Sequence, residues 1–338
     1  MNYFCYHVLG KVLVTTGYNF RKGNYGRKTE ILDLKNPHLR HVSRIEDLPA
    51  VRYDSVGAVI KGHPVICGGR QLGEIFQDYF ILDEKPLVMR SLPQQRSYAS
   101  SVVLEEKLWM TGGEDRTPKW SDVIKKYSCH LSSTIFISLN DPPMNGPDLP
   151  IIVKQHCMIK YDESSVLLTG GVQNRLVSNQ TWILKNPLTG LESMLGPPLN
   201  TKRRSHCCGK MILGDKIFIV VAGGSDESHT LDSVELLDPF GGKFWISGPE
   251  MPMKLGHSAM ITSPDGRGVI VIGGGNEEAN DHDGKEYDII MELRGESIQT
   301  LAWTILDQRL EYARSGHLAF SIPDDNSFSF PIPRMGVF

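Results

Sequence analysis

The chain lacks the features that would direct it to a membrane or a nucleic acid. None of its apolar runs approaches the ~18 consecutive residues of a membrane-spanning helix. Its 36 basic and 39 acidic residues give a formal net charge of −3, so no broad basic surface is expected. Its first eleven residues lack a basic start and a small-residue cleavage site, which predicts folded structure and not a signal peptide. We therefore predict no nucleic-acid partner and no membrane association.

Common enzyme signatures are also absent. The sequence contains no HExxH, no P-loop, no GxSxG and no CxxC motif. The acidic loop 276–284 lacks the alternating oxygen ligands of a calcium loop. Four histidines recur at repeat-equivalent positions, where we expect structural hydrogen bonds: His156, His206, His257 and His317. The sequence thus predicts no catalytic residue, no cofactor and no metal site.

Six cysteines fall mostly inside apolar stretches and show no paired spacing. This pattern predicts buried, reduced thiols and a cytoplasmic location. A secreted form stays open if the chain is a fragment, and only then would the sequon Asn179–Gln180–Thr181 matter.

The sequence does contain a repeated apolar run that ends in glycine, clearest at Val220–Gly224. Glycine at the end of a strand indicates positive φ or close approach of another backbone. The first glycines of the copies stand at positions 17, 68, 112, 170, 223 and 273, with Thr16–Gly17 replacing the doublet in the first copy. Their spacing of 44–58 residues matches kelch-type propeller units of about 50 residues.

Each copy also carries four strand signals separated by turns. In the fifth copy the expected strands are 207–213, 216–222, 233–239 and 243–247, and in the third copy we place one strand at Val123–Tyr127. An antiparallel meander of this kind cannot bury both faces of its sheet alone. The uninterrupted repeat therefore predicts one closed domain.

The sequence resembles kelch-repeat β-propellers in four features taken together. They are the glycine doublets, the strand Val234–Asp238, the turn Met251–Pro252 after Trp245, and the basic residues that precede a histidine or a small residue. The resemblance covers nearly the whole chain. It implies an all-β, six-bladed β-propeller of four-stranded antiparallel blades over residues 1–323, followed by a C-terminal tail at 324–338. It also implies that a C-terminal strand near 316–323 completes blade one, although the segment 3–8 competes for that place.

In this fold, the loops after each doublet and the loops between blades surround the mouth of the central channel. Loops on a rigid scaffold often carry recognition, and arginines present forked donors suited to carboxylates. The candidate partner-binding residues are Tyr18, Arg70, Arg116, Asn174 and Arg175 after the doublets, and Arg52, Arg96, Arg204 and Arg314 between blades. The arginines between blades could instead bond loop carbonyls, so Arg70, Arg116 and Arg175 are the better candidates.

These residues lead to a first hypothesis of a non-enzymatic protein–protein interaction module. Its partner would be a peptide or protein, acidic ones included, and kelch domains that it resembles serve as ubiquitin ligase adaptors or bind actin. The alternative is a sugar-acting enzyme, because some six-bladed kelch proteins, such as bacterial sialic-acid mutarotases, use Arg and Glu at the channel mouth. A pocket with converging acid and base groups would favour the enzyme, and a wide shallow basin would favour a protein partner.

Overall fold

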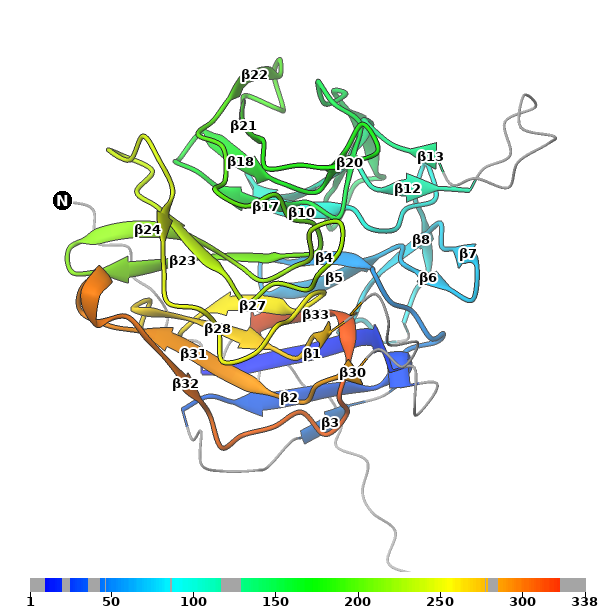
Figure 1. Ribbon diagram of the computed structural model, residues 1–338. Coiled ribbons are helices and arrows are strands. Elements are labelled where there is room, and N and C mark those ends of the chain that lie inside the picture. The colour runs from blue at the N-terminus through cyan, green and yellow to red at the C-terminus, as the bar shows by residue number, and fades with distance from the viewer. Residues whose placement is uncertain are drawn as a thin grey trace, which may run out of the picture.

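The computed structural model describes residues 10–19, 25–35, 43–45, 47–85, 87–116, 129–276, 278 and 285–322 (Figure 1). Its main strands form six antiparallel sheets of four strands each. The predicted fold class, an all-β six-bladed propeller of four-stranded blades, is confirmed. Among the described residues, no helix is long and apolar enough to cross a bilayer.

The blades are built from strands in the same order from the channel outward. Blade one contains β33 (Ser315–Ile322), β1 (Lys11–Tyr18), β2 (Thr29–Asp33) and β3 (Ser43–Ile45). Blade two contains β4 (Val56–Ile60), β5 (His63–Cys67), β8 (Asp78–Ile81) and β9 (Arg90–Ser91). Blade three contains β10 (Ser100–Leu104), β11 (Lys107–Thr111), β14 (Thr134–Ile137) and β15 (Met144–Gly146).

The second half of the ring follows the same plan. Blade four contains β17 (Cys157–Lys160), β18 (Ser165–Thr169), β21 (Thr181–Lys185) and β22 (Glu192–Leu195). Blade five contains β23 (Cys207–Leu213), β24 (Lys216–Ala222), β25 (Val234–Leu237) and β26 (Ile246–Ser247). Blade six contains β27 (Ala259–Thr262), β28 (Gly268–Ile272), β31 (Ile290–Arg294) and β32 (Ala302–Ile305).

Short additional sheets, of two or three strands, form in the loops around the doublets. They are β6 (Arg70–Gln71) with β7 (Glu74–Ile75), β12 (Glu114–Asp115) with β13 (Cys129–His130), β16 (Val153–Lys154) with β19 (Val172–Gln173) and β20 (Leu176–Val177), and β29 (Gly275–Asn276) with β30 (Lys285–Glu286).

The ring is closed by the C-terminal strand. β33 pairs antiparallel with β1 from Lys11↔Ile322 to Tyr18↔Ser315, so the prediction that a C-terminal strand completes blade one is confirmed. The competing segment 3–8 and the tail 324–338 lie outside the described residues. The domain boundary at residue 323 stays a prediction.

A circle of backbone hydrogen bonds fixes the six blades around the channel. In each bond, the backbone N–H of a residue at or just before the start of the innermost strand of one blade donates to the carbonyl oxygen of the equivalent residue in the neighbouring blade, with N···O distances of 2.8–3.1 Å. These ring residues, in the order of the bonds, are Asp54, Tyr98, Gln155, Ser205, His257 and Gly316, and their φ angles lie between +52° and +61°. Five non-glycine residues thus hold a left-handed conformation, which costs energy and is often found at functional sites.

The glycine doublets occur where the backbone of the next blade passes. A Cβ atom on Gly68 would lie 2.1 Å from the carbonyl oxygen of Arg96, and one on Gly223 would lie 2.2 Å from that of Leu255. Both glycines also have positive φ. Only glycine meets both requirements, which explains why the doublets mark the repeat so clearly.

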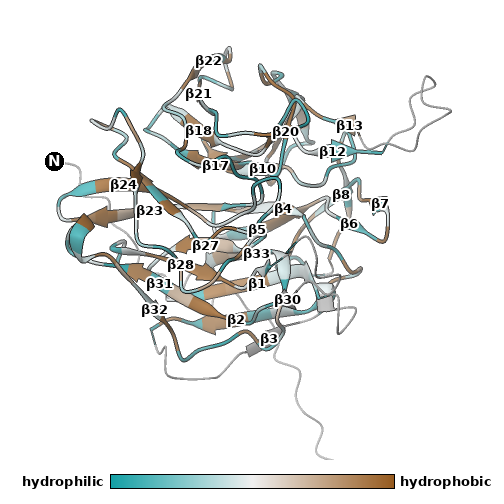
Figure 2. Ribbon diagram, in the orientation of Figure 1, coloured by the Kyte–Doolittle hydropathy of each residue, from teal (hydrophilic) through white to brown (hydrophobic). Residues whose placement is uncertain are grey.

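Apolar clusters fill the six seams between neighbouring blades. Val220 of blade five packs with Val271 of blade six, for example, and Val65 of blade two packs with Leu108 of blade three, all fully buried. Figure 2 shows apolar stretches in brown along strands of the blades such as β1, β28 and β31. Each blade is therefore stabilised by its two neighbours, as the closed repeat requires.

The third strand of blade three differs from the sequence-based assignment. We expected it at Val123–Tyr127, a segment that lies outside the described residues, but β14 at Thr134–Ile137 pairs with β11 instead. All four residues of β14 are buried. A fully buried strand shows no alternation of apolar and polar residues, and this is why the periodicity analysis missed it.

The cysteines also depart from expectation. Cys157 and Cys208 form a disulfide, with 6.1 Å between their Cα atoms, across the seam between β17 and β23. The prediction of six reduced thiols is therefore wrong for these two, because adjacent blades bring together residues about one repeat apart. Cys67 and Cys207 are free and buried, and burial raises the pKa of the Cys207 thiol to about 12. The argument for the cytoplasm from reduced thiols fails, and a cytoplasmic location stays a prediction.

Candidate functional site

Four buried arginines connect the blades beneath the mouth of the channel. Each lies two residues before a ring residue and is at most 1% exposed: Arg52, Arg96, Arg203 and Arg314. Each donates from Nη1 to the carbonyl oxygen of the first doublet residue, or of Thr16 in blade one, at 2.7–2.9 Å. We call them the scaffold arginines.

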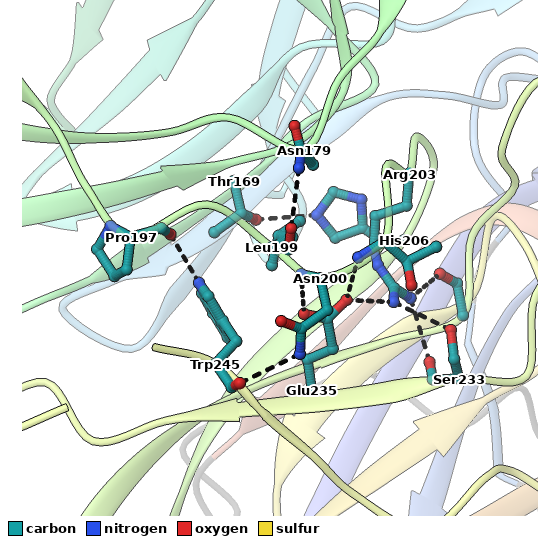
Figure 3. Close-up of polar contacts among 12 residues, drawn as sticks. Thr169, Asn179, Pro197, Leu199, Asn200, Arg203, His206, Ser233, Glu235 and Trp245 are labelled. Atoms are coloured by element: carbon teal, nitrogen blue, oxygen red, sulfur yellow. Dashed lines mark hydrogen bonds and ion pairs between the residues drawn. The ribbon is translucent and has the colours of Figure 1, made fainter. Parts of the chain in front are cut away.

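Three of the scaffold arginines were predicted to bind a partner. For Arg52, Arg96 and Arg314 this prediction is wrong, because their guanidinium groups are enclosed in the seams and bonded to carbonyl oxygens. In blade five the equivalent residue is Arg203, not Arg204. Figure 3 shows Arg203 between Ser233 and Glu235, whose carboxylate lies 2.7 Å from Nη2.

Arg204 lies one residue later, directly before the ring residue Ser205. Its backbone forms a bridge with Ser225, while its side chain is only partly buried. Its Nε is buried without a hydrogen-bond partner among the described residues, and its guanidinium forms no ion pair in that part of the chain. Arg204 is therefore still a candidate for binding an anion.

A chain of charged groups crosses the mouth above the ring residues. Lys154 Nζ lies 2.7 Å from Glu114 Oε2, and Glu114 Oε1 lies 3.7 Å from Arg70 Nη1. Arg70 Nε donates to Asp54 Oδ2 at 3.0 Å, and Asp54 Oδ1 lies 3.4 Å from His257 Nδ1. The contact between Asp54 and His257 joins the ring residue before the innermost strand of blade two to the ring residue before the innermost strand of blade six. We call these five residues and Tyr98 the mouth cluster.

The carboxylates of the mouth cluster are enclosed while the cations are more accessible. The side chains of Asp54 and Glu114 are 3% and 4% exposed, whereas those of His257, Lys154 and Arg70 are 13%, 17% and 27% exposed. Burial would lower the pKa of Arg70, but Asp54 and Tyr98 raise it, and the net pKa lies above the ordinary arginine value. Arg70 is thus a permanent cation.

Tyr98 lies between two of these cations. Arg70 and Lys154 approach its ring to 4.2 and 5.5 Å, and Arg70 Nη2 donates to its hydroxyl group. Burial and the nearby Asp54 hold the pKa of the Tyr98 hydroxyl well above its ordinary value, against the opposing effect of Arg70. A neutral phenol therefore fixes the position of Arg70 in the mouth.

Below the mouth cluster, a cavity of about 120 Å³ continues into the channel. Its wall includes His156, His206 and His317, each one residue after a ring residue. Burial lowers the pKa of His156 and of His317 to about 3, and that of His206 also falls well below its usual range. His156 and His206 lie 3.0 and 2.9 Å from Thr111 and Thr169 hydroxyls, which confirms their structural hydrogen bonds.

His257 differs from the other three histidines. His257 is itself a ring residue, whereas the other three each follow a ring residue by one position. His257 Nδ1 faces the carboxylate of Asp54. Sequence reasoning grouped it with His156, noted Lys154 only as the basic residue of the repeat pattern, and missed Asp54 and Glu114. Alignment of the repeats on the start of each innermost strand would have separated His257 from the others. In the described ranges, no three His, Cys, Asp or Glu side chains are placed to hold a metal ion.

The remaining predicted site residues surround the mouth at different distances from the cluster. Arg70 belongs to it, and Tyr18 packs against Tyr53, whose ring lies 5.2 Å from the Arg70 guanidinium. Arg116 is exposed and donates to Gly73 O. Asn174 and Arg175 form an exposed turn between β19 and β20, with φ of +50° and +73°. The structure thus brings Arg70 and Tyr18 together and leaves Arg116, Asn174 and Arg175 on the rim.

Comparisons with known proteins support the fold and leave the family open. No family model matches the chain, and no curated protein matches it. Among solved structures, the one titled "Structure of YjhT" superposes with a TM-score of 0.67 and 13% sequence identity. The match covers 87% of this chain and 94% of that one. At this level of identity the comparison shows a shared propeller fold.

Proposed function

We propose that the chain is an enzyme that interconverts the anomers of a sugar at the mouth of its propeller. The prediction of a non-enzymatic interaction module is withdrawn, because the finding that YjhT, a sialic acid mutarotase, shares the fold contradicts it. The same comparison and the repeated doublets support a kelch-type origin of the blades. The enzyme alternative also agrees better with the converging acidic and basic groups of the mouth cluster.

The observation that carries the proposal is the position of Asp54 between His257 and Arg70. Its two carboxylate oxygens face different partners, His257 Nδ1 at 3.4 Å and Arg70 Nε at 3.0 Å. His257 is the more accessible member of its pair and lines the channel cavity. Asp54 therefore orients the imidazole, and His257 transfers the proton.

The reaction needs one proton to move between two oxygens of the same carbon. His257 takes the proton of the anomeric hydroxyl and becomes an imidazolium ion, which the Asp54 carboxylate stabilises. The imidazolium then gives a proton to the ring oxygen as the bond from that oxygen to the anomeric carbon breaks and the carbonyl forms. Rotation of the open-chain carbonyl and reversal of these steps give the other anomer, with His257 neutral again.

The cations at the mouth support an acidic sugar as the substrate. Arg70 and Lys154 are already compensated by Asp54 and Glu114. Arg204 has no such partner within the described ranges, so its forked donors suit the carboxylate of a sialic-acid-type sugar.

The test is the rate of anomer exchange measured by proton NMR, with N-acetylneuraminic acid as the acidic sugar and glucose as the neutral one. The wild type is expected to accelerate exchange of the acidic sugar above the buffer rate. His257→Gln and Asp54→Asn should each lower the catalysed rate by roughly 10²–10⁴-fold, the range of general acid–base effects.

His63→Gln is the matched control. His63 also forms a pair with a carboxylate, Asp83 Oδ2 at 2.7 Å, but it begins β5 at the end of blade two away from the mouth. This variant should keep the full rate. A folded wild-type protein that accelerates neither sugar, or an equal loss in all three variants, would overturn the proposal.

A further inference from the structure

A second cavity, of about 500 Å³, opens between blades four and five. Five carboxamide side chains line it: Gln173, Asn174, Asn179, Gln180 and Asn200. The cavity is connected to the mouth cluster by one strand ladder, because Gln173 and Val172 of β19 pair with Val153 and Lys154 of β16. Its volume falls in the range of ~300–1,000 Å³ that is usual for ligand sites.

Three of the five amides are held in one orientation by the protein itself. Asn179 Nδ2 donates to Leu199 O at 3.0 Å, and Asn200 Nδ2 donates to Trp245 O at 3.1 Å (Figure 3). Gln173 Nε2 donates to Gly170 O at 2.9 Å and to Gln180 O at 3.1 Å. Gln173 uses both of its amide hydrogens inside the fold, and Asn179 and Asn200 use one each, so these amides keep an orientation in which their oxygens can accept from a ligand.

Gln173 gives an independent indication that a donor is missing. The residue is only 5% exposed, and its Oε1 has no hydrogen-bond partner among the described residues. A buried acceptor without a donor costs about 1–3 kcal/mol. Because Gln173 lines the cavity, a ligand hydroxyl close to this oxygen would supply the missing donor.

The remaining wall offers no uncompensated charge and has an apolar side that suits the face of a ring. Lys202 is the one charged residue of the lining, and its Nζ lies 2.9 Å from Glu227, which compensates it. Leu176 and Val177 provide an aliphatic side. A sugar ring combines both properties, since its hydroxyl groups donate and accept around the edge while its C–H face is apolar.

We propose that this cavity binds a neutral saccharide unit, separately from the reaction at the mouth. The site goes beyond the proposed activity and does not depend on it. Because the cavity and Lys154 share the β16–β19 ladder, a glycan chain held here would run beside the mouth cluster.

The test uses methyl glycosides, which have no free anomeric hydroxyl and cannot undergo anomer exchange. Methyl glucoside, methyl galactoside and methyl N-acetylglucosaminide are titrated into isotope-labelled protein, and amide shifts are followed by NMR. At least one glycoside should shift the backbone amides of residues 173–180 in a saturable way. Gln180→Leu, at an exposed position, should weaken this binding at least tenfold, and Asn179→Leu should do the same.

Gln299→Leu is the matched control, because Gln299 is an exposed amide in blade six, away from the cavity. It should bind the glycosides like the wild type. His257→Gln should also keep glycoside binding while losing anomer exchange, and Gln180→Leu should show the reverse. The site would be refuted by the absence of saturable shifts at 173–180 with every glycoside, by unchanged affinity in folded Gln180→Leu, or by selective binding of extended peptides instead.

Discussion

Arg203 and Arg204 are neighbours in the sequence but belong to different regions of the molecule. Arg203 lies in the scaffold beneath the doublets, where it is fully buried and bonded to Gly223 O, Ser233 O and Glu235. Arg204 lies at the mouth, partly exposed, with no side-chain partner among the described residues. Arg204 and the ring residue Ser205 are both only partly buried, whereas Arg203 before them and His206 after them are buried. The position within the repeat, and not the residue type, thus decides which arginine stabilises the fold.

The same division separates other groups. The scaffold holds the four buried arginines, the neutral histidines of the channel wall and the disulfide, whereas the mouth holds the charged chain from Lys154 to His257. If this comparison is right, changes in the scaffold alter the free energy of unfolding and leave the chemistry of the folded protein intact. Changes at the mouth do the opposite.

The largest effect on stability is expected from Arg203→Ala. The variant leaves the Glu235 carboxylate buried without its cation and three backbone or hydroxyl groups without a donor. Removal of one partner of a buried pair costs about 3–5 kcal/mol. Urea unfolding followed by circular dichroism measures this loss. A decrease below ~1 kcal/mol would remove the distinction between the two regions.

The disulfide comes next. Among the described residues, the apolar cluster in the seam between blades four and five has the fewest buried members of the six clusters, and Cys157–Cys208 crosses this seam. Cys157→Ser should lower the free energy of unfolding by about 2–4 kcal/mol, because the bridge restricts the unfolded chain. Wild type treated with a reducing agent should show the same loss. Mass spectrometry that finds both thiols free in the folded, untreated protein would contradict the bridge.

Acidification should act on the scaffold through its buried histidines. Because the folded pKa of His156 and of His317 is about 3, against ~6.5 in the unfolded chain, only the unfolded state binds protons between these values. Stability is therefore complete above pH 6.5 and falls as the pH drops, by about 1.4 kcal/mol per pH unit for each histidine.

Unfolding of His156→Gln at pH 7, 6 and 5 checks this effect. The variant should have a lower free energy of unfolding at pH 7. Below pH 6.5 its free energy of unfolding should fall less steeply than that of the wild type, by about 1.4 kcal/mol per pH unit. The variant Gln299→Leu, at an exposed position that does not titrate, should keep the wild-type slope. Identical slopes in all three proteins would mean that His156 is protonated in the folded state.

The propeller fold could be predicted from the sequence because its most regular feature, the glycine doublet, is required by steric contact. The glycine doublets are required wherever a neighbouring backbone approaches, so they recur at Gly68 and Gly223 whatever the function. β14 was missed because full burial removes the alternation that marks a strand. The disulfide was missed because its pairing depends on contact between blades, which no local spacing encodes.

The site was harder to predict because a difference of one residue in the alignment of the repeats changes which side chains are assigned to the mouth. Asp54 and His257 are 203 positions apart and meet only when the ring closes. The arginine pattern was assigned to Arg204 when the scaffold position is Arg203. The scaffold arginines recur in four blades, whereas the ring residues at the mouth differ from blade to blade, so the candidate functional residues lie in the least regular part of the repeat.

The smallest effect on stability is expected from Arg204→Gln, although it lies directly beside Arg203. Its guanidinium forms no ion pair in the described part of the chain, so the free energy of unfolding should change by less than ~0.5 kcal/mol. The KM for N-acetylneuraminic acid should nevertheless rise at least tenfold, because the carboxylate loses its forked donor, while kcat changes little. The two neighbouring variants thus divide the molecule: one lowers stability without changing the reaction of the remaining folded protein, and the other weakens substrate binding at constant stability. A large loss of stability in Arg204→Gln, or an unchanged KM for the acidic sugar, would place Arg204 in the scaffold and leave the mouth without its anion-binding group.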